Sequence, residues 1–89
     1  MNDRDLFDLM TQSPLERLAR ARKSLPTPEV RRAIREAAGV SQPEMAKALG
    51  VSTATVSRWE SGLVVPSSSI VVDYVDALNM LARVETETR

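Results

Sequence analysis

The sequence predicts an all-α fold, a compact bundle of about five helices, and three observations lead to this prediction. Alanine and leucine are abundant while only 3 of the 89 residues are glycine, a composition that favours helices. Serine or threonine followed by proline and glutamate marks several helix starts. No stretch has the alternating apolar pattern that is typical of a strand.

The first two predicted helices begin at capping residues that precede a proline. Ser13 and Glu16 are spaced as a capping box ahead of a helix over residues 14–24. Thr27 opens a second helix by the same logic, and Gly39 ends it. In this second helix, the side chains that we expect to face the core are Val30, Ala33, Ile34, Ala37 and Ala38.

Two short helices follow, joined by a sharp turn. Ser41 and Glu44 form a capping box for a third helix that runs to about Leu49. Gly50 supplies the left-handed backbone conformation that the turn requires, and Ser52 caps a fourth helix. A fifth helix follows Pro66. The core side chains expected from these three helices are Met45, Ala46, Leu49, Val56, Trp59, Ile70, Tyr74, Ala77, Leu78 and Leu81.

The ends of the chain differ from its middle in composition. We divide the chain into a helical extension over 1–26, a helix-turn-helix domain over 27–84 and a flexible tail over 85–89. Residues 1–12 are expected to contain a short amphipathic turn whose apolar side chains are Leu6, Phe7, Leu9 and Met10.

The composition argues against enzymatic chemistry. The chain has no cysteine and no histidine, which removes disulfides, thiolate or imidazole metal sites and histidine-assisted nucleophiles. The acidic residues lie at surface-like helical spacings, so we expect no enzyme activity, no metal and no cofactor. The longest apolar run is about three residues, far below the ~20 of a membrane span, so we expect no membrane contact and a cytoplasmic location.

Residues 41–62 carry the most specific pattern in the chain. Two helices that cross closely need a small residue at their contact, which Ala46 provides, and a glycine in the turn four residues later, which Gly50 provides. The second helix carries small polar residues and one arginine, Arg58, on its outward face. This pattern predicts a helix-turn-helix that reads DNA.

On these residues the chain resembles the lambda-repressor/Cro-like, or XRE-type, helix-turn-helix family of bacterial and phage regulators, over roughly residues 28–80. The matching motifs are Ser41-Gln42, Trp59-Glu60-Ser61-Gly62, the following Pro66, and Arg35 ahead of Gly39. The resemblance implies a structural ion pair between Arg35 and Glu60. It also implies that the helix over 53–60 enters the major groove.

The candidate DNA contacts fall into two sets. Arg58 can bond guanine through two hydrogen bonds, and it joins Thr53, Ala54 and Ser57 as the base-contacting candidates. The N-terminus of the third helix points its N–H groups outward and so favours a phosphate. The phosphate-contacting candidates are Gln42, Ser41, Ser52, Thr55, Arg35 and Ser61.

Two further surfaces suggest partners other than DNA. Leu63, Val64 and Val65 form an apolar loop, which either contacts a protein, a second copy included, or covers the core. The helix over 14–24 is basic although the formal net charge of the chain is +0. This helix could contact a protein partner or, through Arg17, Arg20, Arg22 and Lys23, the DNA backbone.

We therefore expect a small transcriptional regulator, a repressor, that binds double-stranded DNA sequence-specifically and forms a homodimer. One alternative is an antitoxin or phage accessory DNA-binding factor with a protein partner. The other is a protein-interaction adaptor that does not read DNA, which the neutral charge favours and the free polar face around Arg58 disfavours.

Overall fold

The structure, a computed structural model, describes residues 13–87. These residues form five α-helices and no strand, which confirms the predicted all-α fold for this part of the chain. The helices are α2 (Pro14–Ser24), α3 (Pro28–Ala37), α4 (Gln42–Leu49), α5 (Thr53–Ser61) and α6 (Val71–Glu87). The amphipathic turn expected within residues 1–12 lies outside the described residues.

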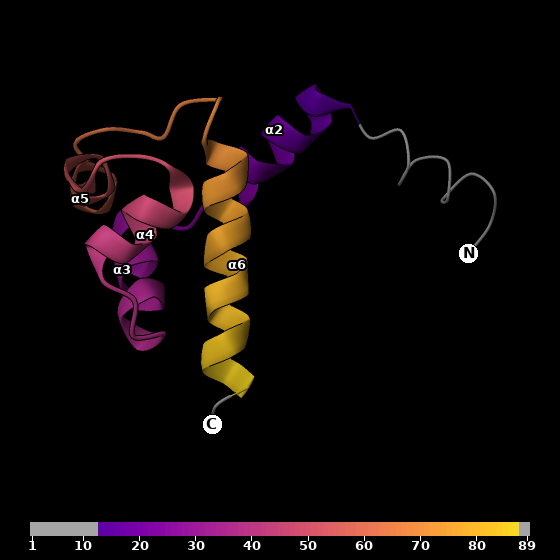
Figure 1. Cartoon of the computed structure of the whole chain (residues 1–89). Helices are drawn as coiled ribbons and strands as arrows, with labels where there is room; N and C mark the ends of the chain where they lie inside the picture. Colours follow the sequence, from indigo (N-terminus) through magenta and orange to yellow (C-terminus); the bar gives the residue numbers. More distant parts are fainter. Residues whose placement is uncertain (1–12, 88–89) are drawn as a thin grey trace.

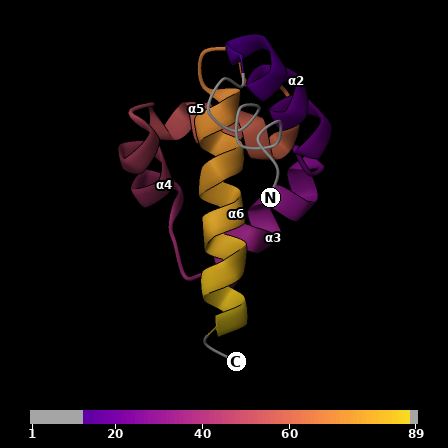
Figure 2. The same cartoon turned by 90° about the vertical axis from the view of Figure 1, so that its right-hand side faces the viewer.

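The long helix α6 runs through the middle of the molecule (Figure 1), and α4 and α3 lie on either side of it in Figure 2. The Tyr74 ring of α6 packs on Trp59 of α5, with ring centroids 4.6 Å apart. Helix α3 packs against both α5 and α6, and α4 packs against α5. Helix α2 packs along the other side of α6, so that α6 separates the first turns of α2 from α5 (Figure 1). This arrangement leaves one face of α5 without a covering helix among the described elements.

The helix starts are fixed by local hydrogen bonds at the predicted capping residues. The Ser13, Thr27 and Ser52 hydroxyls each accept a hydrogen bond from a backbone N–H of the first helical turn, at 3.1, 3.4 and 3.1 Å. Ser41 and Glu44 form the predicted reciprocal capping box. Of the three predicted capping boxes, only this one is complete within the described residues; at Ser13 and at Thr27 the hydroxyl half alone forms.

The turn between α4 and α5 depends on Gly50. This residue has φ +71°, in the left-handed region that side chains with a Cβ disfavour. Its N–H donates to the Lys47 carbonyl at 3.3 Å, and the Val51 N–H donates to the Ala46 carbonyl at 3.0 Å. The chain is therefore turned between the two helices within a few residues, as the sequence predicted.

Two groups of buried side chains hold the helices together. The larger group joins α4, α5 and α6 and consists of Met45, Ala46, Val56, Trp59, Tyr74 and Leu78. The smaller group joins α2 to α6 and consists of Ala21, Val71 and Val75. Leu25 packs against both groups, so α2 shares its core with the rest of the bundle.

Helix α6 continues through Glu87, so residues 85–87, expected within a flexible tail, are helical. The division of the chain into 1–26, 27–84 and 85–89 stays a prediction.

The buried face of α3 differs from the predicted one. Val30, Ala33 and Ala37 were expected inside but are exposed, whereas Arg31 and Arg35 are buried at 6% and 7% exposure. Ile34 and Ala38 are half-buried, as residues at the edge of the same face. The prediction for the three exposed residues was wrong because α3 docks between α5 and α6 through its arginine-bearing face, and apolar periodicity alone does not reveal this.

Candidate nucleic-acid interface

Helix α5 is held by one face and exposed on the other. Val56 and Trp59 are 0% and 2% exposed and anchor it in the larger core group. The four base-contacting candidates lie on the outward face and are all exposed: Thr53, Ala54, Ser57 and Arg58. The structure therefore brings these four together on one surface, and their contact with bases stays a prediction.

The polar side chains of this surface are not engaged with the described part of the protein. Among residues 13–87, the side chains of Thr53, Ser57 and Arg58 have no hydrogen bond, and Arg58 has no ion pair. A polar group whose partners are water can exchange them for base edges without breaking an internal bond. The outward face of α5 is thus open to a groove-binding role.

The hydroxyl groups predicted to contact phosphates are engaged locally. The Ser52 hydroxyl accepts from the Thr55 N–H and lies 2.8 Å from the Thr55 hydroxyl. The Ser61 hydroxyl donates to the Arg58 carbonyl at 3.0 Å. These bonds fix the two ends of α5, and each hydroxyl keeps further hydrogen-bonding capacity for a phosphate oxygen.

The start of α4 has few free donors. The Ser41 N–H donates to the Glu44 carboxylate at 2.9 Å and the Glu44 N–H donates to the Ser41 hydroxyl at 3.2 Å. The hydrogen bond from the Ser41 N–H to this carboxylate lowers the pKa of Glu44. Pro43 has no N–H, so the Gln42 N–H is the first-turn donor without a partner in the described residues.

The Glu60 carboxylate is the centre of a buried polar network between α3, α4 and α5. Arg35 donates to both of its oxygens, from Nε to Oε2 at 2.6 Å and from Nη2 to Oε1 at 2.8 Å. Arg35 Nη1 also donates to the Val40 carbonyl at 2.8 Å, and the Gln42 amide donates to Glu60 Oε1 at 3.1 Å. The Arg35–Glu60 ion pair expected from the family resemblance is present in this bidentate form.

The electrostatics of this network favour the charged forms of both partners. Burial by itself raises the pKa of Glu60, but the hydrogen bonds from Arg35 and Gln42 and the nearby arginine charges outweigh it, so its pKa lies below the ordinary value. The hydrogen bond to Glu60 raises the pKa of Arg35 above its ordinary value, against the opposing effect of burial. The pair is charged at neutral pH and fixes α5 relative to α3.

Two of the predicted phosphate contacts thus have internal roles. The Arg35 side chain is 9% exposed and the Gln42 side chain is half-buried, with its amide directed at Glu60. Sequence reasoning missed Arg32, whose side chain is 53% exposed and whose Nε lies 3.5 Å from Glu60 Oε1. The signal that could have found it is its position three residues before Arg35, on the same side of a helix.

The apolar loop after α5, residues 63–65, is exposed on the surface of the protein. Leu63 and Val65 are 80% and 79% exposed and Val64 is 45% exposed. The backbone is held at its start, where the Leu63 N–H donates to the Arg58 carbonyl at 3.1 Å. Of the two explanations for this loop, covering the core does not suit Leu63 and Val65, whereas a contact surface does.

Within residues 13–87, no helix combines the length and apolarity needed to cross a bilayer. The same described residues contain no cluster of three or more carboxylate, thiol or imidazole side chains with the geometry of a metal site.

Comparison with known proteins agrees with this geometry. A family described as a helix-turn-helix domain matches residues 32–88, which include α4, α5 and α6. The chain is also 41% identical over 51 residues to YazB of Bacillus subtilis (strain 168), an uncharacterized HTH-type transcriptional regulator, covering 57% of this chain and 74% of that protein. No solved structure matches the chain. The protein therefore belongs to the XRE-like helix-turn-helix family.

Proposed function

We propose that this protein is a sequence-specific, double-stranded DNA-binding transcriptional regulator that inserts α5 into the major groove. The single observation that supports this proposal best is the exposed face of α5, whose polar side chains make no hydrogen bond within the described residues. The opposite face of α5 is fixed to the protein by Trp59 and Glu60. The name of the relative YazB, an HTH-type transcriptional regulator, supports the same role. Binding in this way would block access of polymerase to the site, so the expected action is repression.

The residues of the proposed interface have distinct roles. Arg58 recognises guanine O6 and N7, the methyl groups of Thr53 and Ala54 contact thymine, and Ser57 hydrogen-bonds a base edge. The phosphate contacts are made around the rim of α5 and at the start of α4, by Ser41, the backbone N–H of Gln42, Ser52, Thr55 and Ser61. Arg35 has a different role in the proposal, because its guanidinium is committed to Glu60 and Val40 and orients α5.

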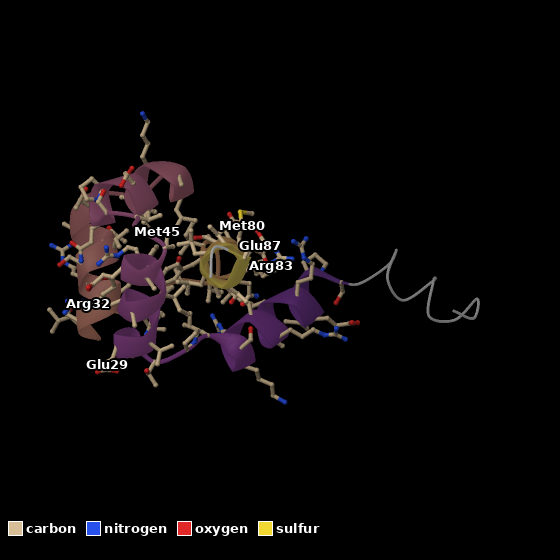
Figure 3. All side chains as sticks on the ribbon, turned by 90° about the horizontal axis from the view of Figure 1, so that it is seen from below. Glu29, Arg32, Met45, Met80, Arg83 and Glu87 are labelled. Carbon is tan, nitrogen blue, oxygen red and sulfur yellow. The ribbon has the colours of Figure 1, made fainter. Side chains whose placement is uncertain are left out.

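The proposal is tested by selecting bound sequences from a pool of random duplexes and measuring the affinity of the selected duplex by titration. We expect Arg58→Ala to lose about 1–3 kcal/mol of discrimination at one guanine position. A matched control is Arg83→Ala, which removes an exposed arginine of α6 on the other side of the molecule (Figure 3) and should bind as the wild type does. If Arg58→Ala leaves binding to every duplex unaltered, the proposed reading surface is wrong.

The exposed loop at 63–65 favours a second partner, a further copy of the chain, because a two-fold dimer reads a palindromic site. Light scattering of the protein bound to its selected duplex measures this directly. A palindromic consensus with two copies bound supports the homodimer. One copy on a non-palindromic site contradicts it and would favour an accessory factor or antitoxin that presents the loop to another protein.

A wild-type protein that selects no duplex at all contradicts the DNA-binding proposal. That result would instead favour the protein-interaction adaptor.

A further inference from the structure

We propose that Arg32 is a phosphate-contacting residue, and that Glu60 positions its guanidinium beside the start of α4. In this arrangement Arg32, rather than Arg35, supplies the contact from α3 to the DNA backbone. The inference rests on the DNA-binding function proposed above and names a residue of that interface that sequence reasoning did not select.

Three side chains converge on one oxygen of Glu60. Arg35 Nη2 lies 2.8 Å from Oε1, the Gln42 amide nitrogen lies 3.1 Å from it, and Arg32 Nε lies 3.5 Å from it. Because Gln42 is the first residue of α4, this convergence places the Arg32 guanidinium near the side chain of the residue that begins that helix. Arg32 points toward the α5 side of the molecule, whereas Met80 and Arg83 lie at α6 (Figure 3).

The two arginines near Glu60 differ in what they can still bind. The Arg35 side chain is 9% exposed and donates to Glu60 and to the Val40 carbonyl. The Arg32 side chain is 53% exposed, and within residues 13–87 its guanidinium has ion-pair contacts but no hydrogen bond. A guanidinium has five N–H donors arranged to bind a phosphate, so Arg32 keeps this capacity and Arg35 does not.

The charge of Arg32 is also available. Arg35 already neutralises Glu60 through two short hydrogen bonds. The remaining carboxylate near Arg32 is Glu36, at 4.0 Å and with a side chain that is 61% exposed, so water screens this contact. A phosphate can therefore replace Glu36 as the partner of Arg32 with little loss.

The start of α4 needs a positively charged side chain close to it in order to bind a phosphate. Its capping box uses the Ser41 and Glu44 N–H groups and places the Glu44 carboxylate at the same end of the helix. The Gln42 N–H is left as the open first-turn donor of the described residues, and one N–H beside a carboxylate is a weak anion site. Arg32 adds a full positive charge at this position.

The test compares Arg32→Ala and Arg32→Lys with the control Arg83→Ala in the full chain. Binding is measured against salt concentration on a mixed-sequence duplex of about 20 base pairs and on the selected duplex. We expect Arg32→Ala to weaken binding about five- to tenfold on both duplexes and to reduce the slope of log K against log salt by about one. Arg32→Lys should keep most of the slope, and Arg83→Ala should change nothing.

A second measurement separates a phosphate contact from a structural effect. A set of duplexes is used in which one phosphate at a time is replaced by a neutral methylphosphonate. Replacement at one position should weaken DNA binding by the wild type and leave DNA binding by Arg32→Ala unchanged. The melting temperature of Arg32→Ala should stay within about 2 °C of the wild type, since exposed ion pairs contribute little.

If Arg32→Ala binds DNA with an unchanged salt slope, the inference is wrong. In that case Arg58→Ala can still lose sequence preference, and the proposed function then stands. A wild type that binds no duplex overturns the proposed function and this inference together. The two failures are therefore distinguishable.

Discussion

Two arginines one turn apart on α3 are buried to nearly the same extent, 6% exposed for Arg31 and 7% for Arg35, yet their surroundings are opposite. Arg35 lies toward α5 and donates to Glu60 and Val40. Arg31 lies toward α6, with its guanidinium carbon 5.9 Å from the centre of the Tyr74 ring. The burial of a charge does not by itself reveal whether that charge stabilises the fold, because its hydrogen-bond partners decide the sign of its contribution to the free energy of unfolding.

The difference is one of hydrogen bonding. Within residues 13–87, Arg31 Nε and Nη1 and the Tyr74 hydroxyl are buried without a hydrogen-bond partner. Burial raises the pKa of that hydroxyl, while the positive charge of Arg31 acts in the opposite direction. A desolvated guanidinium costs several kcal/mol, which a cation–π contact of about 2 kcal/mol offsets only in part. We infer that the Arg35 site stabilises the fold and that the Arg31 site does not.

The largest expected effect is the loss of Glu60. Glu60→Ala leaves Arg35 buried without a carboxylate and should lower the free energy of unfolding by about 3–5 kcal/mol, measured by urea denaturation. Arg35→Ala should lower it by less, because Arg32 at 3.5 Å remains close to Glu60. Arg35→Ala should also weaken DNA binding, since α5 loses its attachment to α3. An unchanged melting temperature in Arg35→Ala would show that the buried pair does not stabilise the protein.

An intermediate effect is expected on acidification. The folded pKa of Glu60 is depressed, so its contribution to stability is present above the unfolded value of about 4.3 and is lost as the pH falls through the folded pKa. The difference in free energy of unfolding between the wild type and Glu60→Gln should therefore shrink as the pH is lowered below about 4. Taking the difference removes the titration of other carboxylates, such as Glu44. A difference that is independent of pH contradicts the assignment.

The smallest effect is expected at Arg31. Arg31→Met replaces a poorly bonded buried charge by an apolar chain of similar length, and should leave the free energy of unfolding unchanged or raise it by up to about 2 kcal/mol. Tyr74→Phe removes the other unpartnered group and should change stability by less than about 1 kcal/mol. Urea denaturation of both variants gives the comparison with Arg35→Ala. A loss above about 2 kcal/mol in Arg31→Met would mean that the two arginine sites are energetically alike.

Local features were predicted well from the sequence. The capping serines and threonine, the turn at Gly50 and the bounds of α2 depend on atoms within four residues of one another, so short sequence motifs specify them. The exposed positions on α5 followed from helical periodicity for the same reason. The Arg35–Glu60 pair, with partners 25 residues apart, was expected only through the resemblance to a known family.

The buried face of α3 and the inward direction of Gln42 were not predicted. The first depends on how α3 docks between α5 and α6, and the second on how α4 meets α5. An arginine stem can line a helix interface as well as an apolar residue does. Arg32 was missed for the same reason, since its position beside Glu60 exists only after the helices have docked.

The sequence by itself determined where helices begin and end and which side of α5 faces water, because hydrogen bonds and periodicity within one or two turns decide both. Only the tertiary structure decided which arginine of α3 has its hydrogen bonds satisfied by a buried carboxylate, which has two buried nitrogens without a hydrogen-bond partner in the described residues, and which stays exposed. The physical reason is that each guanidinium depends on groups supplied by other helices: Glu60 of α5 for Arg35 and Arg32, and Tyr74 of α6 for Arg31.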